Sequence, residues 1–156
     1  MKGGFRLAVD RPADEVFDFL ADLRNESLWN PRVRQLTLTT PGPIGAGSVF
    51  SGSYQGLGTL LTTLTEYERP TRVGFRSEGS RADLAGNFTL HAQGDAVSVV
   101  LDADVRPKGL LSLLAPLLAA TFRRQNRAAA GRLKAALEAH VGTWNDPQGG
   151  LGARLR

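Results

Sequence analysis

Hydrophobic and polar residues alternate in several stretches of the chain. Phe5, Leu7 and Val9 alternate with shorter or polar residues near the N-terminus, and every second residue from 97 to 105 is apolar. Because successive side chains of a strand point to opposite faces, this period of two predicts strands with one buried face. The other five strands of a seven-stranded antiparallel sheet are predicted over 33–38, 48–54, 59–67, 73–75 and 84–90.

Two short helical segments are predicted after the first strand. Pro12 suits the first position of a helix, and Asp14 and Glu15 fall in the first turn, where the helix dipole favours negative charge. Apolar residues then recur at helical spacing as far as Leu23. A loop or a second short helix is predicted to end before Pro31, because the residue that precedes a proline disfavours the helical conformation.

The longest helix is predicted near the C-terminus, from about Gly109 to His140. Pro116 lies inside this helix and is expected to kink it, because proline removes one backbone hydrogen bond and crowds the preceding turn. Basic residues occupy the face opposite the apolar stripe, which makes the helix amphipathic. The stripe is predicted to contain Leu110, Leu113, Leu114, Leu117, Thr121, Phe122, Ala129, Leu133, Ala136, Leu137 and His140.

A single domain over residues 1–140 is expected to contain all of these elements. A chain of 156 residues is long enough to bury roughly two-thirds of its unfolded surface around one core. Residues 141–156 contain four glycines and one proline and show no regular pattern. We therefore expect them to form a flexible C-terminal tail.

The composition excludes several kinds of chemistry. The chain has no cysteine, which excludes disulfides, thiolate metal ligands and cysteine nucleophiles. His91 and His140 are the only histidines, too few for a convincing zinc or iron site. Neither a metal nor a cofactor is expected.

Charge and hydropathy bear on the partners and the location of the protein. The formal net charge is +4, and basic residues cluster over 123–134. This cluster suggests contact with nucleic acid or an anionic membrane, but no aromatic residues interleave with it, so a solvated helix face is favoured. No leader segment is apparent, and the most apolar run, 110–120, is far shorter than the ~20 residues that span a bilayer. We expect a cytoplasmic protein without a transmembrane segment, either a monomer or a homodimer, for which nucleic acid is an unlikely partner.

The order of the elements and several motifs resemble the START-like superfamily, which has the helix-grip fold. The segment VDRPADEVFDFLADL, at 9–23, and the following Trp29-Asn30-Pro31 are similar to the opening of its polyketide cyclase/dehydrase-like family. Gly47-Ser48-Val49-Phe50 and LTEYERPTRVGF, at 64–75, resemble later landmarks of that family. The resemblance covers about residues 3–140. It implies an α+β fold in which a curved sheet wraps around the C-terminal helix and leaves a ligand cavity between them.

The predicted elements also indicate a cavity without the resemblance, because one helix covers only part of the concave face of a strongly bent sheet. Trp29 is a candidate for its wall through the family resemblance, and the leucines of the long helix are expected to form a lid. For the aromatic residues, ordinary core packing is the alternative. The predicted ligand-binding residues are Trp29, Phe50, Tyr54, Phe75, Phe88, Leu113, Leu114, Leu117, Thr121 and Gln125.

The expected function is binding or carriage of a small hydrophobic molecule that is aromatic, polyketide-like or lipid-like. The alternative is a polyketide cyclase or dehydratase that uses acid–base chemistry without a cofactor. No catalytic residue is predicted, because His91 is expected at the surface and Asp102 and Asp104 on the outer face of the sheet. A weaker alternative is an interaction module that uses the basic helix.

Overall fold

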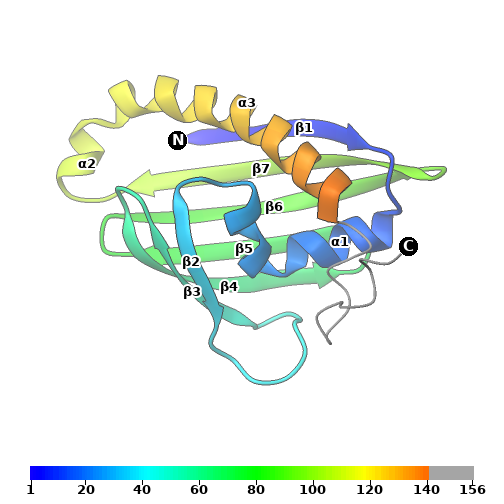
Figure 1. The fold of residues 1–156 in the computed structure, drawn as a ribbon. Coiled ribbons are helices and arrows are strands. Elements are labelled where there is room, and N and C mark those ends of the chain that lie inside the picture. The colour runs from blue at the N-terminus through cyan, green and yellow to red at the C-terminus, as the bar shows by residue number, and fades with distance from the viewer. Residues whose placement is uncertain (141–156) are drawn as a thin grey trace.

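One antiparallel sheet of seven strands forms the body of the computed structural model, which describes residues 1–140. The strand order is β1-β7-β6-β5-β4-β3-β2, so that only β1 pairs out of chain order, with β7 (Figure 1). The strands are β1 (Lys2–Val9), β2 (Val33–Leu38), β3 (Val49–Tyr54), β4 (Gly58–Glu68), β5 (Arg72–Gly79), β6 (Ala82–Gln93) and β7 (Ala96–Pro107).

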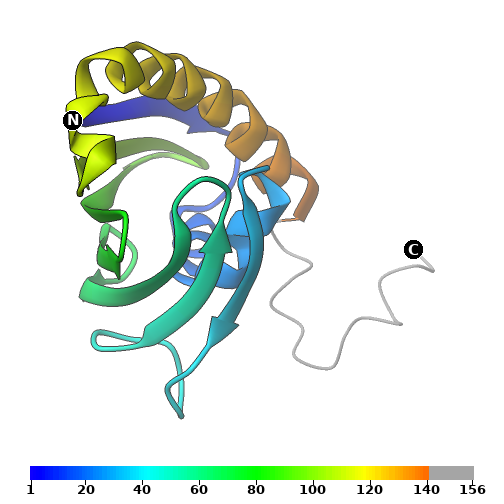
Figure 2. The same cartoon turned by 90° about the vertical axis from the view of Figure 1, so that its left-hand side faces the viewer.

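Helices occupy two positions in the chain. The α-helix α1 (Ala13–Ala21) and the 3₁₀ helix η1 (Leu23–Leu28) connect β1 to β2, while α2 (Leu110–Leu113) and α3 (Ala115–His140) follow β7. The sheet curls, and α3 lies across its concave side (Figure 2). This arrangement confirms the predicted α+β helix-grip fold, with two short helices after the first strand.

The concave face of the sheet carries the apolar side chains that the alternation predicts. Phe88 of β6 is paired with Leu101 of β7, and Leu7 of β1 with Val99, and all four side chains are buried. Since neighbouring strands place these residues on the same face, they form a continuous apolar surface. Helix α1 packs onto one part of this surface through Phe17 and other buried residues.

Helix α3 covers the concave face unevenly. Its buried residues are Leu133, Ala136 and Leu137, which all lie in its C-terminal half. These three side chains belong to the same core cluster as the apolar residues of the sheet. The N-terminal half has no buried residue, and the sheet beneath it is therefore only partly filled. This uneven covering creates the space for a site.

The predicted long helix is broken rather than kinked. Helix α2 ends at Leu113 and α3 begins at Ala115, with Leu114 between them in a non-helical conformation. Pro116 consequently lies in the first turn of α3, where its missing N–H group removes no helical hydrogen bond. The predicted flexible tail at 141–156 lies outside the described residues.

A candidate ligand cavity

A cavity of about 790 Å³ lies between the concave face of the sheet and the N-terminal half of α3. Its wall is mainly apolar and receives residues from the sheet, from α1 and η1, and from α2 and α3. The aromatic wall includes Phe5 and Trp29, whose rings meet edge to face at 6.5 Å, and Phe75 and Phe88, whose ring centres are 6.1 Å apart.

One end of this cavity is open. The turn between β3 and β4 lines it at Gln55 and Gly56, and Arg32 lies beside them; all three are exposed. Pro107 and Leu111 line the cavity from the opposite side of the same end. Phe19 and Leu20 of α1 are buried and close the cavity at the α1 end, whereas exposed residues of the β3–β4 turn border it at the other end.

Six of the ten predicted ligand-binding residues line this cavity. They come from the residue that follows η1, from three strands and from α3. Thr121 is largely exposed, whereas Phe88 is buried. The six residues are Trp29, Tyr54, Phe75, Phe88, Thr121 and Gln125.

Four predicted residues do not line it. Phe50 is completely buried in the core, where it pairs with Thr62 across β3 and β4. Leu113 and Leu117 are 76% and 74% exposed, and Leu114 is 46% exposed. The leucines expected to form the inner side of a lid therefore lie on its outer side.

The cavity side of the helical cover is formed by a different set of residues. Leu111 of α2 and Leu118 of α3 line the cavity, and Phe122 and Ala129 continue the same side of α3. Within α3, Leu118, Phe122 and Ala129 follow helical spacing back from the buried Leu133. Counted from Leu133 with 3.6 residues per turn, Leu117 falls outside the cavity side of the helix. The buried C-terminal half of α3 therefore indicates which side of the whole helix faces the sheet.

A carboxyl group of η1 is the most unusual polar feature of the cavity wall. The hydroxyl of Tyr54 donates a hydrogen bond of 2.9 Å to Oε2 of Glu26, and Nδ2 of Asn30 donates one of 2.7 Å to Oε1. All three residues line the cavity. The sequence analysis predicted Tyr54 but missed Glu26 and Asn30, although their i, i+4 spacing is a signal that they share one side of a helical turn.

Burial raises the pKa values of both Glu26 and Tyr54. Loss of surrounding water raises the pKa of the Glu26 carboxyl, and the hydrogen bonds from Asn30 and Tyr54 offset part of this increase. Burial also raises the pKa of the Tyr54 hydroxyl well above its usual value, and the nearby Glu26 adds to the effect. A carboxyl group with a raised pKa, directed into a cavity, can hold or release a proton near a bound molecule.

Helix α3 adds amide groups to the wall. Gln125 and Asn126 both line the cavity. Nδ2 of Asn126 is buried without a hydrogen-bond partner, and it lies against Gly3 of β1, where any larger residue would collide with it. The open polar surface of α3 is therefore provided by Gln125 and Thr121 rather than by this nitrogen.

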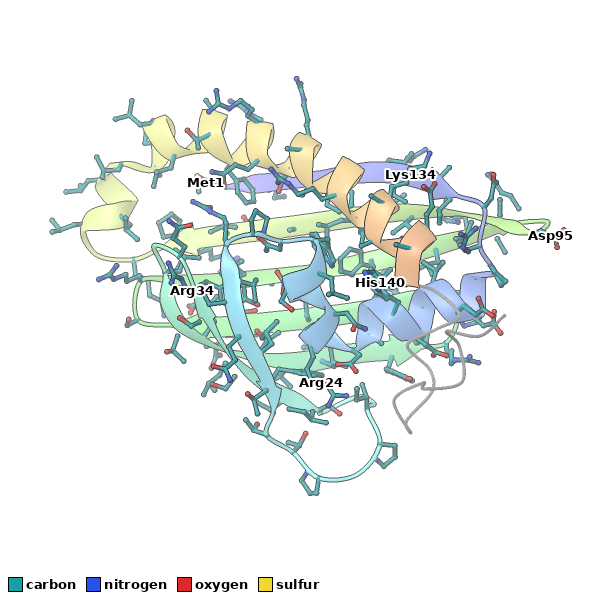
Figure 3. The ribbon with its side chains drawn as sticks, in the orientation of Figure 1. Met1, Arg24, Arg34, Asp95, Lys134 and His140 are labelled. Atoms are coloured by element: carbon teal, nitrogen blue, oxygen red, sulfur yellow. The ribbon has the colours of Figure 1, made fainter. Side chains whose placement is uncertain are left out.

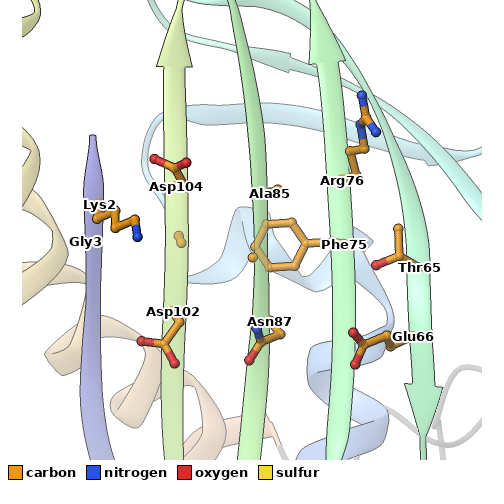
Figure 4. A pocket seen from close by; sticks show the side chains of 12 residues that line it. Lys2, Gly3, Thr65, Glu66, Phe75, Arg76, Ala85, Asn87, Asp102 and Asp104 are labelled. Carbon is orange, nitrogen blue, oxygen red and sulfur yellow. The ribbon is translucent and has the colours of Figure 1, made fainter.

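A second hollow, of about 580 Å³, lies on the outer face of the sheet (Figure 4). Asp102 and Asp104 line it, which agrees with their predicted position on that face. Asp104 forms an ion pair with the N-terminal amine at 3.2 Å, which is the main reason that its pKa is lowered. This hollow is smaller and more open than the cavity beneath α3, so that cavity is the stronger candidate for a site.

The structure of residues 1–140 also bears on the other kinds of site that the sequence could contain. No group of three or more histidine, aspartate or glutamate side chains is placed to hold a metal ion in this part of the chain. His91 is exposed and lies outside the cavity wall, as expected. No helix within the described part of the chain is long and apolar enough to cross a membrane.

The fold and the cavity together define a helix-grip protein of the START-like superfamily. The chain belongs to the family described as polyketide cyclase/dehydrase and lipid transport, whose model matches residues 6–138. The family's description covers both cyclase or dehydrase activity and lipid transport, and it does not distinguish between them for this chain. A search of curated proteins gives no significant match.

Several solved structures are similar in fold. TTHA0849 from Thermus thermophilus has a TM-score of 0.73 and 18% identity, covering 89% of this chain and 98% of that one. The Zhui aromatase/cyclase from a Streptomyces species has a TM-score of 0.70 and 16% identity, covering 93% and 98%. Ara h 8.0201 has a TM-score of 0.60 and 13% identity, covering 88% and 98%. At these identities the similarity shows the fold alone.

Proposed function

We propose that this protein binds a small, largely apolar molecule in the cavity beneath α3. The observation that carries the proposal is the cavity of about 790 Å³, open at one end, with a mainly apolar wall. Sites for small molecules typically have volumes of about 300–1,000 Å³, an apolar wall and a few polar groups that orient the ligand. The family membership supports the same class of ligand.

The wall favours a ligand with a flat, ring-containing body. Trp29, Phe75 and Phe88 present aromatic surface, which packs well against other rings. Glu26, Tyr54 and Gln125 provide the polar groups. We infer that a polar substituent of the ligand lies toward η1 and that its apolar body lies along β6 and α3.

The proposal can be tested with N-phenyl-1-naphthylamine, an apolar dye whose fluorescence increases in a dry environment. The wild-type protein is expected to bind it in a saturable manner, with one dye per chain. Leu118→Arg places a charged side chain in the cavity, and Leu118→Trp fills the cavity without adding charge. Both variants are expected to reduce dye affinity at least tenfold.

Leu117→Arg is the matched control for these variants, because Leu117 is adjacent in sequence but lies on the outer side of α3. It is expected to leave dye binding unchanged. Circular dichroism would verify that each variant is folded. Equal dye binding by the wild type and both Leu118 variants would refute the proposal, and so would loss of binding in Leu117→Arg alone.

A second candidate function is acid–base catalysis on the bound molecule, as in a cyclase or dehydratase. The observation that favours it is the Glu26 carboxyl, whose raised pKa and contact with Tyr54 suit proton transfer within the cavity. In its ionised form, Glu26 would accept a proton from the carbon next to a ligand carbonyl, and the electrons of the broken C–H bond would form an enolate of the ligand. The Tyr54 hydroxyl would orient the carboxylate. No step of this reaction needs a metal.

Glu26→Gln separates the two functions, since glutamine has nearly the same shape as glutamate but cannot accept the proton. If the protein is an enzyme, the wild type should turn over members of a panel of poly-β-ketones. Glu26→Gln should do so at least a hundredfold more slowly, because general base catalysis usually contributes a factor of about 10²–10⁴ to the rate. Glutamine keeps an oxygen that can accept a hydrogen bond from the dye, so dye affinity should change far less than turnover. Absence of turnover across the panel would leave binding as the only function.

A further inference from the structure

Four leucines project into solvent at one end of the molecule. Leu110, Leu113 and Leu117 are 81%, 76% and 74% exposed, and Leu114 lies beside them. We call these residues the leucine tip. Leu110 and Leu113 belong to α2, Leu114 lies between the two helices, and Leu117 lies in the first turn of α3. Side chains extend outward from this end of the ribbon in Figure 3. Large aliphatic side chains gathered on a protruding surface usually mark a contact site.

Unbalanced positive charge follows the leucine tip along the chain. No aspartate or glutamate occurs between 105 and 137, whereas the remainder of the chain has more acidic than basic residues. Arg124 and Arg127 are exposed on the outer face of α3 that also carries Leu117, and neither forms an ion pair with a described residue. The basic residues that follow the tip are Arg123, Arg124, Arg127, Arg132 and Lys134, whereas Arg106 and Lys108 precede it and pair with Asp104 and Asp83.

The leucine tip lies beside the open end of the cavity. Leu111, in the same helix as Leu110 and Leu113, lines the cavity from the inner side. Pro107, at the end of β7, lines it as well. A surface that engages the leucine tip therefore also meets the entrance through which a ligand passes.

We propose that the leucine tip and the arginines of α3 dock onto the surface of an anionic lipid bilayer. Exposed aliphatic residues enter the headgroup region of a bilayer, while neighbouring basic side chains attract anionic lipids. The outer face of α2 and α3 has this composition, with leucines at its tip and arginines one to three turns further on. Leu110, Leu113, Leu117, Arg124 and Arg127 do not line the cavity, so the proposal holds whatever the cavity binds.

A second copy of the chain fits this surface less well. A symmetric contact through the leucine tip would place two basic segments side by side. Their like charges would repel each other and weaken the contact. Protein interfaces also favour tryptophan, tyrosine and arginine over leucine at their centres, and the tip contains no aromatic residue. The charge pattern therefore favours an anionic lipid surface.

Flotation with lipid vesicles tests the proposal on the full chain. We expect the wild type to float with vesicles of phosphatidylcholine and phosphatidylglycerol at 3:1 and to remain largely unbound with phosphatidylcholine alone. Leu113→Ser with Leu117→Ser, and separately Arg124→Glu with Arg127→Glu, are expected to weaken binding at least tenfold. Raising the salt concentration should weaken binding of the wild type as well.

Leu28→Ser and Leu61→Ser are matched controls, because these leucines are 48% and 52% exposed but lie outside α2 and α3. They are expected to leave vesicle binding unchanged. Dye uptake verifies that the cavity of each variant is intact. The proposal is wrong if the wild type does not bind anionic vesicles, if the leucine-tip variant binds as well as the controls, or if sedimentation shows that the leucine tip forms a dimer that excludes vesicles.

Discussion

Glu26 has the least ordinary environment of the polar residues in the cavity. Its carboxyl group borders an apolar space and receives two hydrogen bonds, from Tyr54 and Asn30. Donors that face a carboxylate stabilise its charged form, whereas the loss of water destabilises it, and the second effect is the larger here. Ligand binding and pH are therefore expected to be linked through this residue.

The raised pKa of Glu26 predicts a particular dependence of stability on pH. In the folded state the carboxyl keeps its proton above its ordinary pKa of 4.5, where the unfolded chain has lost it. The contribution of Glu26 to stability is therefore complete below that value and decreases as pH rises through the folded-state pKa. The advantage of Glu26→Gln over the wild type in melting temperature should increase with pH above 4.5.

Thermal melts of both proteins between pH 4 and 8 would measure this difference. Taking the difference removes the effect of groups common to both chains. Among these groups, Lys108 lowers the pKa of Asp83 and thereby gives the opposite slope at lower pH. A constant difference between the two melting temperatures over this range would contradict the interpretation of Glu26.

Phe50 and Leu113 offer a direct comparison of core and surface. Both were predicted to face a ligand, but Phe50 is completely buried and Leu113 is 76% exposed. Phe50→Ala should therefore reduce the free energy of unfolding by about 3–5 kcal/mol, which is typical of a truncated core phenylalanine. Leu113→Ala should change it by less than about 0.5 kcal/mol. Urea unfolding of the two variants measures both values, and similar losses would contradict these placements.

The sequence was more informative about which residues are apolar than about what they contact. The alternation in β3 correctly places Phe50 and Tyr54 on the concave face. The pattern does not reveal that Phe50 is part of the packed core whereas Tyr54 lines the cavity. That difference depends on how the curved sheet meets α1 and α3. Glu26 was missed for a related reason, since an acidic residue in a short helix is usually solvated.

At the scale of the elements, the pairing of β1 with β7 depends on a close backbone approach. A Cβ atom at Gly4 would lie only 2.0 Å from the carbonyl oxygen of Leu101. Gly4→Ala must therefore shift one strand and should destabilise the protein by roughly 1–3 kcal/mol, as overpacking typically does. Chemical denaturation and amide exchange in β1 and β7 measure this effect.

Gly131→Ala is the matched control, because Gly131 lies within α3 with open space around its Cβ position. In an exposed helix interior, alanine is more favourable than glycine by about 0.5–1 kcal/mol. This variant should therefore stabilise the protein. Destabilisation of similar size in both glycine variants would show that the strand contact is not the cause.

The phase of the C-terminal helix shows where sequence prediction failed at this scale. The predicted apolar stripe is buried at Leu133 and Leu137, as expected. At Leu113 and Leu117 the prediction was wrong, because these side chains are exposed. The prediction grouped the leucines because they are apolar, but the position of a side chain around a helix is set by 3.6 residues per turn. The break at Leu114 separates α2 from α3 as well.

For the whole molecule, the fold followed from the order of the elements and from local motifs, because each strand and helix carries its own periodic signal. The existence of a cavity was also expected, from the incomplete cover that one helix gives a bent sheet. Its size, its open end and its separation from the leucine tip were not predictable. They depend on the balance between the curvature of the sheet and the volumes of side chains far apart in sequence.

A crystal structure of the protein with N-phenyl-1-naphthylamine tests the central claim most directly. The account predicts ordered dye between Phe88 of the sheet and Leu118 of α3, with its polar nitrogen toward Glu26. A cavity filled by the protein's own side chains, or dye found only on the exposed leucine tip, would contradict it.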